Sequence, residues 1–313
     1  MKMNGGSKDT LLNALRVLQN AGFLLSEVES SDCCFEAIAK KGGDKLLLKT
    51  SDNIDHERKE SAEDLVSFAM AYSASPVMIG LTVHNGALEE DTLYERYGVN
   101  VVSPRTFSEA MNGKLPSVYF KRGGLYFKVN GRYLHQLREE LGLSLGDLAK
   151  KIGVSRKAIY EYETGGMGAT LETVAKIEEV LDRGITAGID IFEWQCAEEP
   201  PPRGPSGPVA RQLHGKLKEI GCKAITFNHA PVDVHARNVG VSFLVNDRDS
   251  EDLRKRVVSA LEMGKLLEME PVLVASDERP RDLDITVIRI DEIKKLESLR
   301  DLERLLDTDR PCE

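Results

Sequence analysis

The sequence has little that would support a membrane-spanning or disulfide-stabilised protein. No stretch approaches the roughly 18 consecutive apolar residues of a membrane-spanning helix, and residues 1–10 lack the apolar run of a secretory signal. The five cysteines form no Cys-x-x-Cys pair, so the sequence favours neither a zinc ribbon nor a disulfide framework. We therefore expect reduced thiols, a cytoplasmic location and no membrane partner.

An excess of positive charge is also absent from the chain as a whole. The 313 residues carry a net charge of −9, and their 41% hydrophobic and 30% charged residues are typical of two or three globular domains. Residues 114–165 are the exception, because ten Lys and Arg against five Asp and Glu give them +5 and leave −14 for the rest. Such a basic segment concentrates attraction for nucleic acid at one surface.

Proline and glycine divide the chain. Residues 197–208 hold five prolines and two glycines and are predicted to form a semi-rigid linker. Residues 8–111 and 209–300 share the predicted order α-β-β-α-β-β-α, so the second segment is interpreted as a possible repeat of the first; two unrelated α/β domains are the alternative. Residues 114–131 are predicted to form a β-hairpin connector, with strands at 118–121 and 125–129 around Arg122-Gly123-Gly124.

Four short helices are predicted within residues 132–196. Gly142 and Gly153 stand where the first two helices should stop, and Ser144, Ser155 and Thr170 can cap the next three. Asn130-Gly131 is expected to close the preceding strand. The residues expected to face inward at helical spacing are Leu134, Leu137, Leu141, Leu148, Ala149, Ile152, Ile159, Tyr162, Leu171, Val174, Ile177, Val180 and Leu181.

This segment resembles the Xre/Cro-type helix-turn-helix. The matching residues are Leu137-Arg138, Gly142-Leu143-Ser144, Leu148-Ala149, Gly153-Val154-Ser155, Ile159 and Glu163. The resemblance implies that the third helix enters a DNA major groove. The DNA-binding residues it implies are Ser144, Lys151, Ser155, Arg156, Lys157, Tyr160 and Glu161. Leu145 departs from the family, which often has glutamine there, and this removes one expected phosphate contact.

Arginine and lysine can donate to guanine O6 and N7, and glutamate can accept from cytosine N4. Phosphate contact or simple solubility is the alternative reading of Arg156 and Lys157, and Tyr160 could instead pack on a sugar. Lys121, Arg122 and Lys128 of the hairpin could reach flanking phosphates, or form a solvated turn.

Residues 8–111 resemble the PD-(D/E)xK nuclease superfamily, especially archaeal Holliday junction resolvases. That family holds Mg²⁺ with an aspartate and with the glutamate of a Glu-x-Lys strand. Lys49 fits the lysine and Asp32 is a candidate for the aspartate, but Leu47 stands at the glutamate position. The segment is therefore interpreted as degenerate, and we expect no catalytic residue, no cofactor and no enzymatic activity.

The corresponding run of the second segment has neither Glu nor Lys. A metal site at His229, Asp233 and His235 is a weaker alternative to structural or solvent-exposed roles, because no further ligand cluster is apparent.

The complete pattern resembles an archaeal family of helix-turn-helix regulators with a nuclease-like N-terminal region. It predicts a multidomain α/β plus all-α fold, in which a central helix-turn-helix is flanked by two similar nuclease-like α-β-β-α-β domains. The expected function is sequence-specific transcriptional regulation by a homodimer bound to double-stranded DNA, with the α/β domains as the dimerisation or effector surface. A Mg²⁺-dependent structure-specific nuclease is the runner-up, and an assembly protein whose helix-turn-helix binds protein is the third reading.

Overall fold

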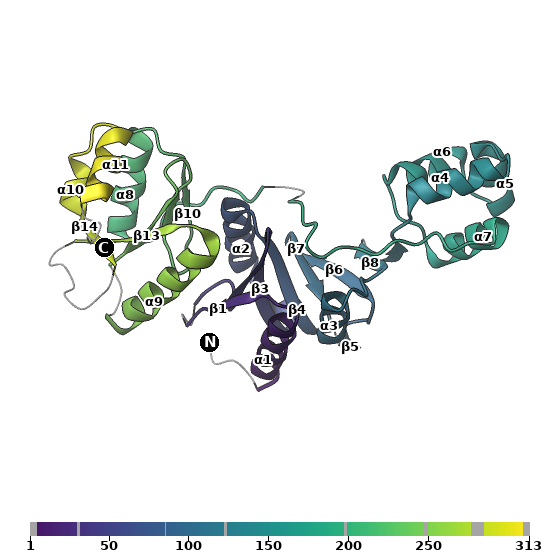
Figure 1. Ribbon diagram of the computed structural model, residues 1–313, viewed down its shortest axis with the longest axis horizontal. Helices are drawn as coiled ribbons and strands as arrows, with labels where there is room; N and C mark the ends of the chain where they lie inside the picture. The colour runs from purple at the N-terminus through teal and green to yellow at the C-terminus, as the bar shows by residue number, and fades with distance from the viewer. Residues whose placement is uncertain are drawn as a thin grey trace.

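The structure is a computed structural model that describes residues 5–29, 32–84, 86–121, 124–196, 199–246, 250–276 and 285–308. Three lobes follow one another in space (Figure 1). An N-terminal α/β unit lies in the middle, a C-terminal α/β unit packs on one side of it, and a helical unit stands at the other end. The helical unit lies at one end of the molecule, because the two α/β units share a core.

The N-terminal unit is built on the longer of two sheets. Its elements are α1 (Gly5–Asn20), β1 (Leu24–Glu27), β2 (Ala37–Lys41), β3 (Asp44–Asn53), the 3-10 helix η1 (Ile54–His56), α2 (Lys59–Tyr72), β4 (Ser75–Val83), β5 (Gly86–Ala87), β6 (Thr92–Arg96), β7 (Val99–Val102) and α3 (Pro104–Met111). The strand order is β1-β2-β3-β4-β7-β6, with β5 on β4. β1, β2 and β3 are antiparallel neighbours, whereas β4 runs parallel to β3 and β7.

The same sheet continues into the predicted hairpin, β8 (Val118–Lys121) and β9 (Gly124–Phe127), because β6 pairs with β8. Arg122 and Gly123 of the predicted turn lie outside the described residues, as do residues 197 and 198 of the linker. The four predicted helices follow the hairpin as α4 (Gly131–Glu140), α5 (Leu145–Ile152), α6 (Arg156–Thr164) and α7 (Leu171–Leu181). They enclose a separate apolar core.

Three expectations for the helical unit are wrong. Leu141 is 53% exposed because α4 ends at Glu140, one residue before it. Leu171 is 66% exposed because it is the first residue of α7 and faces away from the core. Asn130 and Gly131 begin α4 instead of closing a strand, since the Asn130 side chain accepts a hydrogen bond from the Tyr133 amide at 3.2 Å.

The C-terminal unit has a five-stranded sheet in the order β10-β11-β12-β13-β14. Its elements are α8 (Pro208–Glu219), β10 (Ala224–Thr226), β11 (Val234–Ala236), β12 (Val241–Val245), α9 (Ser250–Leu267), β13 (Glu270–Ala275), β14 (Thr286–Arg289), α10 (Ile290–Lys294) and α11 (Leu299–Thr308). Leu302 and Leu306 of α11 are buried in its core, so the packed unit continues past residue 300.

The two α/β units pack on each other through α2 and α9. The Phe68 ring of α2 lies 5.0 Å from the ring of Phe227, and α9 contacts β1 and β2 of the other unit. The Tyr72 hydroxyl is 2.7 Å from the Ser242 hydroxyl, which lies 2.9 Å from the His235 ring. Their buried residues form one continuous apolar cluster. None of the helices in the described ranges has both the length and the apolar character needed to cross a membrane.

Candidate nucleic-acid interface

Helix α6 is held at both of its ends. The Ser155 hydroxyl accepts a hydrogen bond from the Ala158 amide at 3.1 Å, which caps the N-terminus. Gly165, with φ of 77°, supplies the left-handed residue that ends the helix. Ile159 and Tyr162 are buried, so one face of α6 packs on the unit and the opposite face is free.

The side chains predicted to contact DNA from α6 lie mostly on that free face. Arg156 and Lys157 are exposed, and Tyr160 is 55% exposed. Glu161 is only half-buried and turns toward the C-terminal end of the helix, where a Cβ added to Gly166 would lie 2.1 Å from its Oε2 atom. The first turn of α6 is therefore positively charged, and the last turn carries the carboxylate.

Helix α5 precedes α6 across a tight turn at Gly153. Ser144 caps α5 by accepting a hydrogen bond from the Asp147 amide at 3.1 Å, and the Asp147 carboxylate accepts from the Ser144 amide at 3.0 Å. This reciprocal capping box fixes the start of α5. Lys151, in its last turn, is exposed. Leu145, the departure from the family pattern, is the first residue of α5 and is partly buried.

A buried ion pair fixes α6 against α4. The Arg138 Nε atom donates to the Glu163 carboxylate at 2.6 Å, and the Arg138 guanidinium also donates to the Leu143 carbonyl at 2.7 Å. His135 approaches the same carboxylate at 2.8 Å. Burial would raise the pKa of Glu163, but hydrogen bonds from Arg138 and His135 outweigh it and lower that pKa. Both charged residues were noted as motif positions, but their 25-residue separation gave no sequence signal for the pair.

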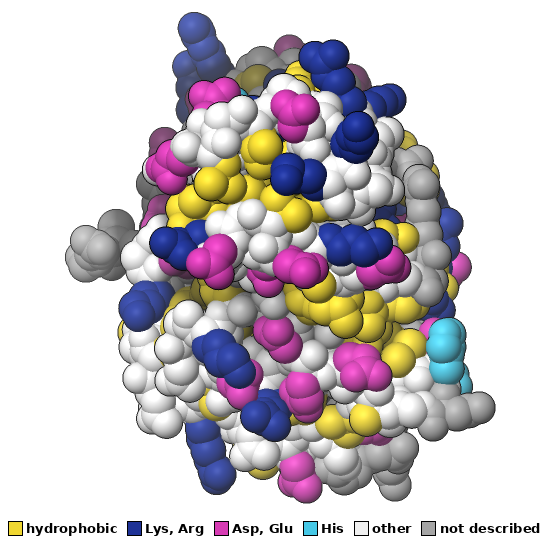
Figure 2. All heavy atoms as spheres, turned by 90° about the vertical axis from the view of Figure 1, so that its right-hand side faces the viewer, with side chains coloured by type: hydrophobic (Ala, Val, Ile, Leu, Met, Phe, Trp, Pro, Cys, Tyr) yellow, Lys and Arg dark blue, Asp and Glu magenta, His cyan; other side chains and the backbone are white. Residues whose placement is uncertain are grey.

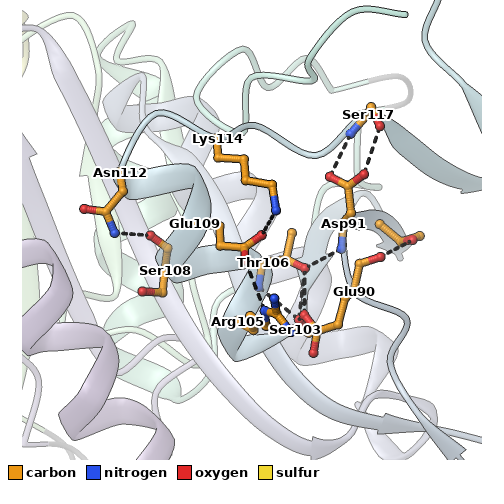
Figure 3. Close-up of polar contacts among 11 residues, drawn as sticks. Glu90, Asp91, Ser103, Arg105, Thr106, Ser108, Glu109, Asn112, Lys114 and Ser117 are labelled. Carbon is orange, nitrogen blue, oxygen red and sulfur yellow. Dashed lines mark hydrogen bonds and ion pairs between the residues drawn. The ribbon is translucent and has the colours of Figure 1, made fainter.

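The contacts at the junction with the N-terminal unit were not predicted from the sequence either. Figure 3 shows the Asp91 carboxylate accepting hydrogen bonds from the Ser117 amide at 3.3 Å and hydroxyl at 2.9 Å, while the Asp91 amide donates to Thr106 at 2.9 Å. Glu90 accepts from the Ser103 hydroxyl, which also caps α3. These contacts join the connector to α3. The residues that make them lie in loops at irregular sequence separations, so no periodic pattern predicts them.

The chain returns from the helical unit beside the point where it entered. Two isolated β-bridges, Phe127 with Ala169 and Val129 with Thr186, join the unit to the hairpin. The Ile189 amide then donates to the Pro116 carbonyl at 2.6 Å. Residues 191–194 belong to the segment 132–196, yet they pack against the N-terminal unit, where the Trp194 indole donates to the Gly98 carbonyl at 2.8 Å.

Charge is unevenly spread over this end of the molecule. Figure 2 looks at it end-on, and Lys and Arg side chains are more frequent in the upper part of the view, the side on which Figure 1 places α6. Asp and Glu side chains are more frequent across the middle and lower part.

The nuclease-like residues have different ion-pair partners. Asp32 is exposed and lies 3.4 Å from Arg58, whereas Lys49 lies 3.8 Å from Glu57, and Leu47 is fully buried. Among the residues with a described position, no three His, Cys, Asp or Glu side chains form a metal-binding group. At the positions suggested by the family pattern, a buried leucine therefore stands where the family has a glutamate.

The histidines of the C-terminal unit have separate partners. His229 lies 2.7 Å from Asp64 of α2, and Asp233 pairs with the buried Arg256. The His235 ring contacts Ser242 instead, and burial, with a smaller contribution from the charge of a nearby arginine, lowers the pKa of His235 to about 4. The three side chains therefore serve three different contacts.

Comparison with known protein families divides the chain at the same place. The sequence model of the PD-(D/E)XK superfamily domain matches residues 7–116, and that of the helix-turn-helix matches residues 134–187. The first match covers the N-terminal α/β unit and the second covers α4 to α7.

Two curated relatives resemble nearly the whole chain. A protein of Methanothermobacter thermautotrophicus, named "Putative HTH-type transcriptional regulatory protein", is 32% identical over 95% of this chain and 94% of its own length. A protein of the same description from Thermococcus kodakarensis is 30% identical over 93% of this chain and 92% of its own. Among solved structures, the SinR protein/SinI protein complex matches 18% of this chain and 54% of the other, with 30% identity and a TM-score of 0.17.

Proposed function

We propose that this chain, which belongs to the archaeal family of HTH-type transcriptional regulatory proteins, regulates transcription by reading duplex DNA with α6 in the major groove. The observation that carries the proposal is the free face of α6. Both ends of the helix are capped and its apolar face is buried, so its polar face is presented on a rigid element.

The exposed residues divide between two roles. Arg156 and Lys157, which are exposed in the first turn of α6, would donate to base edges, and Tyr160 extends the same exposed face. Lys151, which is exposed on α5, would contact a phosphate. Ser144 and Ser155 cap helices, so their side chains orient the amide groups that would face phosphates. Glu161 would accept a hydrogen bond from cytosine if its side chain turned outward.

The proposal is tested by comparing two alanine substitutions. Sequencing of the genomic fragments bound by the full chain identifies the operator, and affinities are then measured on operator and random duplexes at several salt concentrations. Arg156→Ala should lose about 1–3 kcal/mol on the operator and relax the preference at one base pair. Lys151→Ala should weaken all duplexes alike and reduce the salt slope by about one.

A control variant separates these effects from a general loss of charge. Lys176→Ala removes an exposed cation from α7, on the side of the helical unit opposite α6, and should leave both affinities unchanged. If the Arg156 and Lys151 variants behaved identically on operator and random DNA, α6 would not be the reading helix. Mobility on DNA that is insensitive to salt would instead favour the reading in which the helix-turn-helix binds protein.

We further propose that the two α/β units are repeats of one another, with the helix-turn-helix placed between them in the sequence. The strand pairing supports this. In the first unit Leu47 pairs with Pro76 across parallel strands, and in the second Ser242 pairs with Pro271 in the same way. Each unit then has three antiparallel strands followed by two parallel ones, one strand more before the long helix than the sequence patterns predicted.

An acidic residue occupies the same place in both units. Glu36 precedes β2 and accepts a hydrogen bond from the Thr50 amide at 2.5 Å, while Asp233 precedes β11 and accepts from the Val245 amide at 2.7 Å. Thr50 and Val245 each lie three residues beyond the paired positions given above. This correspondence supports a repeat of the units at 8–111 and 209–300, of which the second continues into α11. The 114–131 connector, the 132–196 segment and the 197–208 linker lie between them in the sequence.

We propose that neither α/β unit is a nuclease. The supporting observation is the buried Leu47 at the glutamate position, since a leucine cannot bind Mg²⁺. Incubation of the full chain with duplex and branched DNA and Mg²⁺ should give no cleavage. Cleavage that disappears in Lys49→Ala would favour the nuclease alternative. We also propose that the protein acts in the cytoplasm.

The working form is proposed to be a homodimer, because regulators of this type read two half-sites roughly 34–36 Å apart. Light scattering of the free chain and of its complex with the operator tests this. Two chains per operator are expected, and one chain per operator would overturn the dimer.

A further inference from the structure

A cavity lies where the two α/β units and the segment 199–203 meet. Its volume is about 250 Å³, and its walls come from α2, from the prolines at 200–202, from α8, and from the edge strand β10. It is separate from the α6 surface, because Figure 1 places α6 at the far end of the molecule. Nothing in the DNA-reading function accounts for it.

The acidic groups in its wall are mostly neutralised by other contacts. Arg203 pairs with the Glu63 carboxylate, and Lys59 lies 3.6 Å from the same residue. The buried Asp64 carboxylate accepts hydrogen bonds from the Asn228 and His229 amides at 3.1 and 3.0 Å. Glu199 is exposed and is the remaining acidic residue of the wall.

The cationic groups of the C-terminal unit are in the opposite situation. His214 and Lys218 are one turn apart on α8, and Arg237 reaches the cavity from the loop after β11. Within the described part of the chain, none of these three side chains has an ion pair. Burial, and then the charge of Lys218, lowers the pKa of His214, as expected for a histidine in a positive environment.

The backbone of β10 adds hydrogen-bond donors to the same wall. The Phe227 amide donates to the Asp233 carbonyl, and the Lys223 carbonyl accepts from the Arg237 amide. The backbone amide and carbonyl groups of the odd-numbered residues therefore point toward β11. Alternation in an antiparallel ladder therefore turns the amides of Ala224 and Thr226 toward the cavity edge. The half-buried Met70 and Ile225 supply an apolar surface beside these polar groups.

We propose that this cavity binds a small organic anion, with a phosphate or carboxylate group held by Lys218 and Arg237 and an apolar part against Met70 and Ile225. Uncompensated cations, amide donors and an apolar wall around an open cavity of this size are the features of a small-molecule site. A ligand there would contact both α/β units at once and would therefore stabilise their packing. The proposal stands apart from the DNA-reading function.

Binding is tested on the full chain with three probes of similar shape. Phenyl phosphate and benzoate each carry one of the two anionic groups, and benzyl alcohol is the neutral control. Calorimetric titration at constant ionic strength should give saturable binding of at least one anion at one site per chain, and no binding of benzyl alcohol. Which anion binds more tightly identifies the preferred headgroup.

Variants locate the site. Lys218→Ala and Arg237→Ala should each weaken anion binding at least tenfold, whereas Lys265→Ala, an exposed cation on α9, should bind as the wild type does. Lys218 and Arg237 are exposed, so the melting temperatures without probe should be unchanged and serve as the folding check. Equal affinities in all four proteins, equal binding of the neutral control, or no saturable binding of either anion would overturn the proposal.

Discussion

Arg138 and Glu163 hold opposite charges in a place where water is scarce. Their side chains are 7% and 8% exposed, and the guanidinium also holds the carbonyl at the end of the α4–α5 turn. Removing one partner of such a pair leaves the other charge buried and unpaired, which is why breaking it costs more than the pair contributes. This contact joins α6 to α4.

Glu163→Gln should therefore reduce the free energy of unfolding of the helical unit by about 3 kcal/mol, as measured by denaturant unfolding. Glu139→Gln is the control, since the Glu139 side chain is 62% exposed and lies 3.6 Å from the same guanidinium. It should cost less than about 0.5 kcal/mol. Similar losses in both variants would mean that the buried Arg138–Glu163 pair stabilises the unit no more than the exposed Arg138–Glu139 pair does.

The same pair predicts an acid limit. Because the pKa of folded Glu163 is lowered, its stabilising contribution is present above the unfolded value of about 4.3 and is lost as the pH falls below it. The wild-type unit should lose stability on acidification through that range, and the Glu163→Gln variant should lose less. Parallel pH profiles of the two proteins would contradict the assignment.

Among the elements, α4 and α6 approach each other at a glycine. A Cβ added to Gly131 would lie 2.2 Å from the Glu163 carbonyl oxygen and 2.7 Å from its carbon, which are backbone atoms that cannot turn aside. Gly146, in α5, has nothing closer than 3.7 Å to the same added atom and has no positive φ. A side chain is therefore excluded at Gly131 but can be accommodated at Gly146, 15 residues further along the same unit.

Gly131→Ala should destabilise the helical unit by about 1–3 kcal/mol through overpacking. Gly146→Ala should stabilise it by up to about 1 kcal/mol, because alanine favours helix. Thermal unfolding of the two variants should move in opposite directions from the wild type. A shift of the same sign in both would show that the close approach at Gly131 is not maintained.

The sequence predicted the elements that carry a strong periodic or capping signal. The helices α4 to α7 and their stops at Gly142 and Gly153 are confirmed. The first hairpin strand lies at 118–121 as predicted, whereas the second lies at 124–127 instead of 125–129. Short edge strands such as β1 and β10 were missed, because three or four residues cannot show a reliable alternation. Which exposed residues of α6 contact DNA stays a prediction.

Contacts between distant segments could not be predicted in the same way. The partner of Arg138 lies 25 residues away, and Asp64 meets His229 across 165 residues. Their chemistry was visible in the sequence, but their proximity depends on how the units pack. A single sequence offers no signal for that packing.

At the scale of the whole molecule, the two α/β units meet across a chain of polar groups inside an apolar interface. The Tyr72 hydroxyl, the Ser242 hydroxyl and the His235 ring are buried together there. A pKa of about 4 keeps His235 neutral at physiological pH. Protonation would place a charge in this buried interface, where no ion pair between His235 and a carboxylate is present among the described residues.

The interface should consequently weaken in mild acid. The pKa of His235 is about 4 in the folded state against 6.5 for a free histidine, so its contribution is complete above pH 6.5 and falls between pH 6.5 and 4. The loss should be about 1.4 kcal/mol per pH unit, or about 2 kcal/mol at pH 5. His235→Gln should lack this part of the pH dependence. Identical slopes of unfolding free energy against pH in both proteins would contradict it.

The junction at Asp91 governs how firmly the helical unit is attached. Asp91→Ala removes both hydrogen bonds to Ser117, whereas Asp91→Asn keeps an acceptor and tolerates the positive φ of 55°. Amide hydrogen exchange at residues 117–119 should accelerate about tenfold or more in the alanine variant, for a local loss of about 1.4 kcal/mol, and much less in the asparagine variant. Equal protection in both would mean that the β6–β8 pairing alone secures the junction.

The contact between Ile189 and Pro116 also bears on how this architecture can change over time. This 2.6 Å hydrogen bond joins the segment that leads into the helical unit to the segment that leads out of it. The two ends of the helical unit are therefore neighbours. A gene segment encoding residues 117–188 could be exchanged for a foreign cassette with little disturbance of the N-terminal unit, provided that the new segment keeps a strand that pairs with β6. The protein could then acquire a new operator by exchanging its helical unit, while the two α/β units evolved independently.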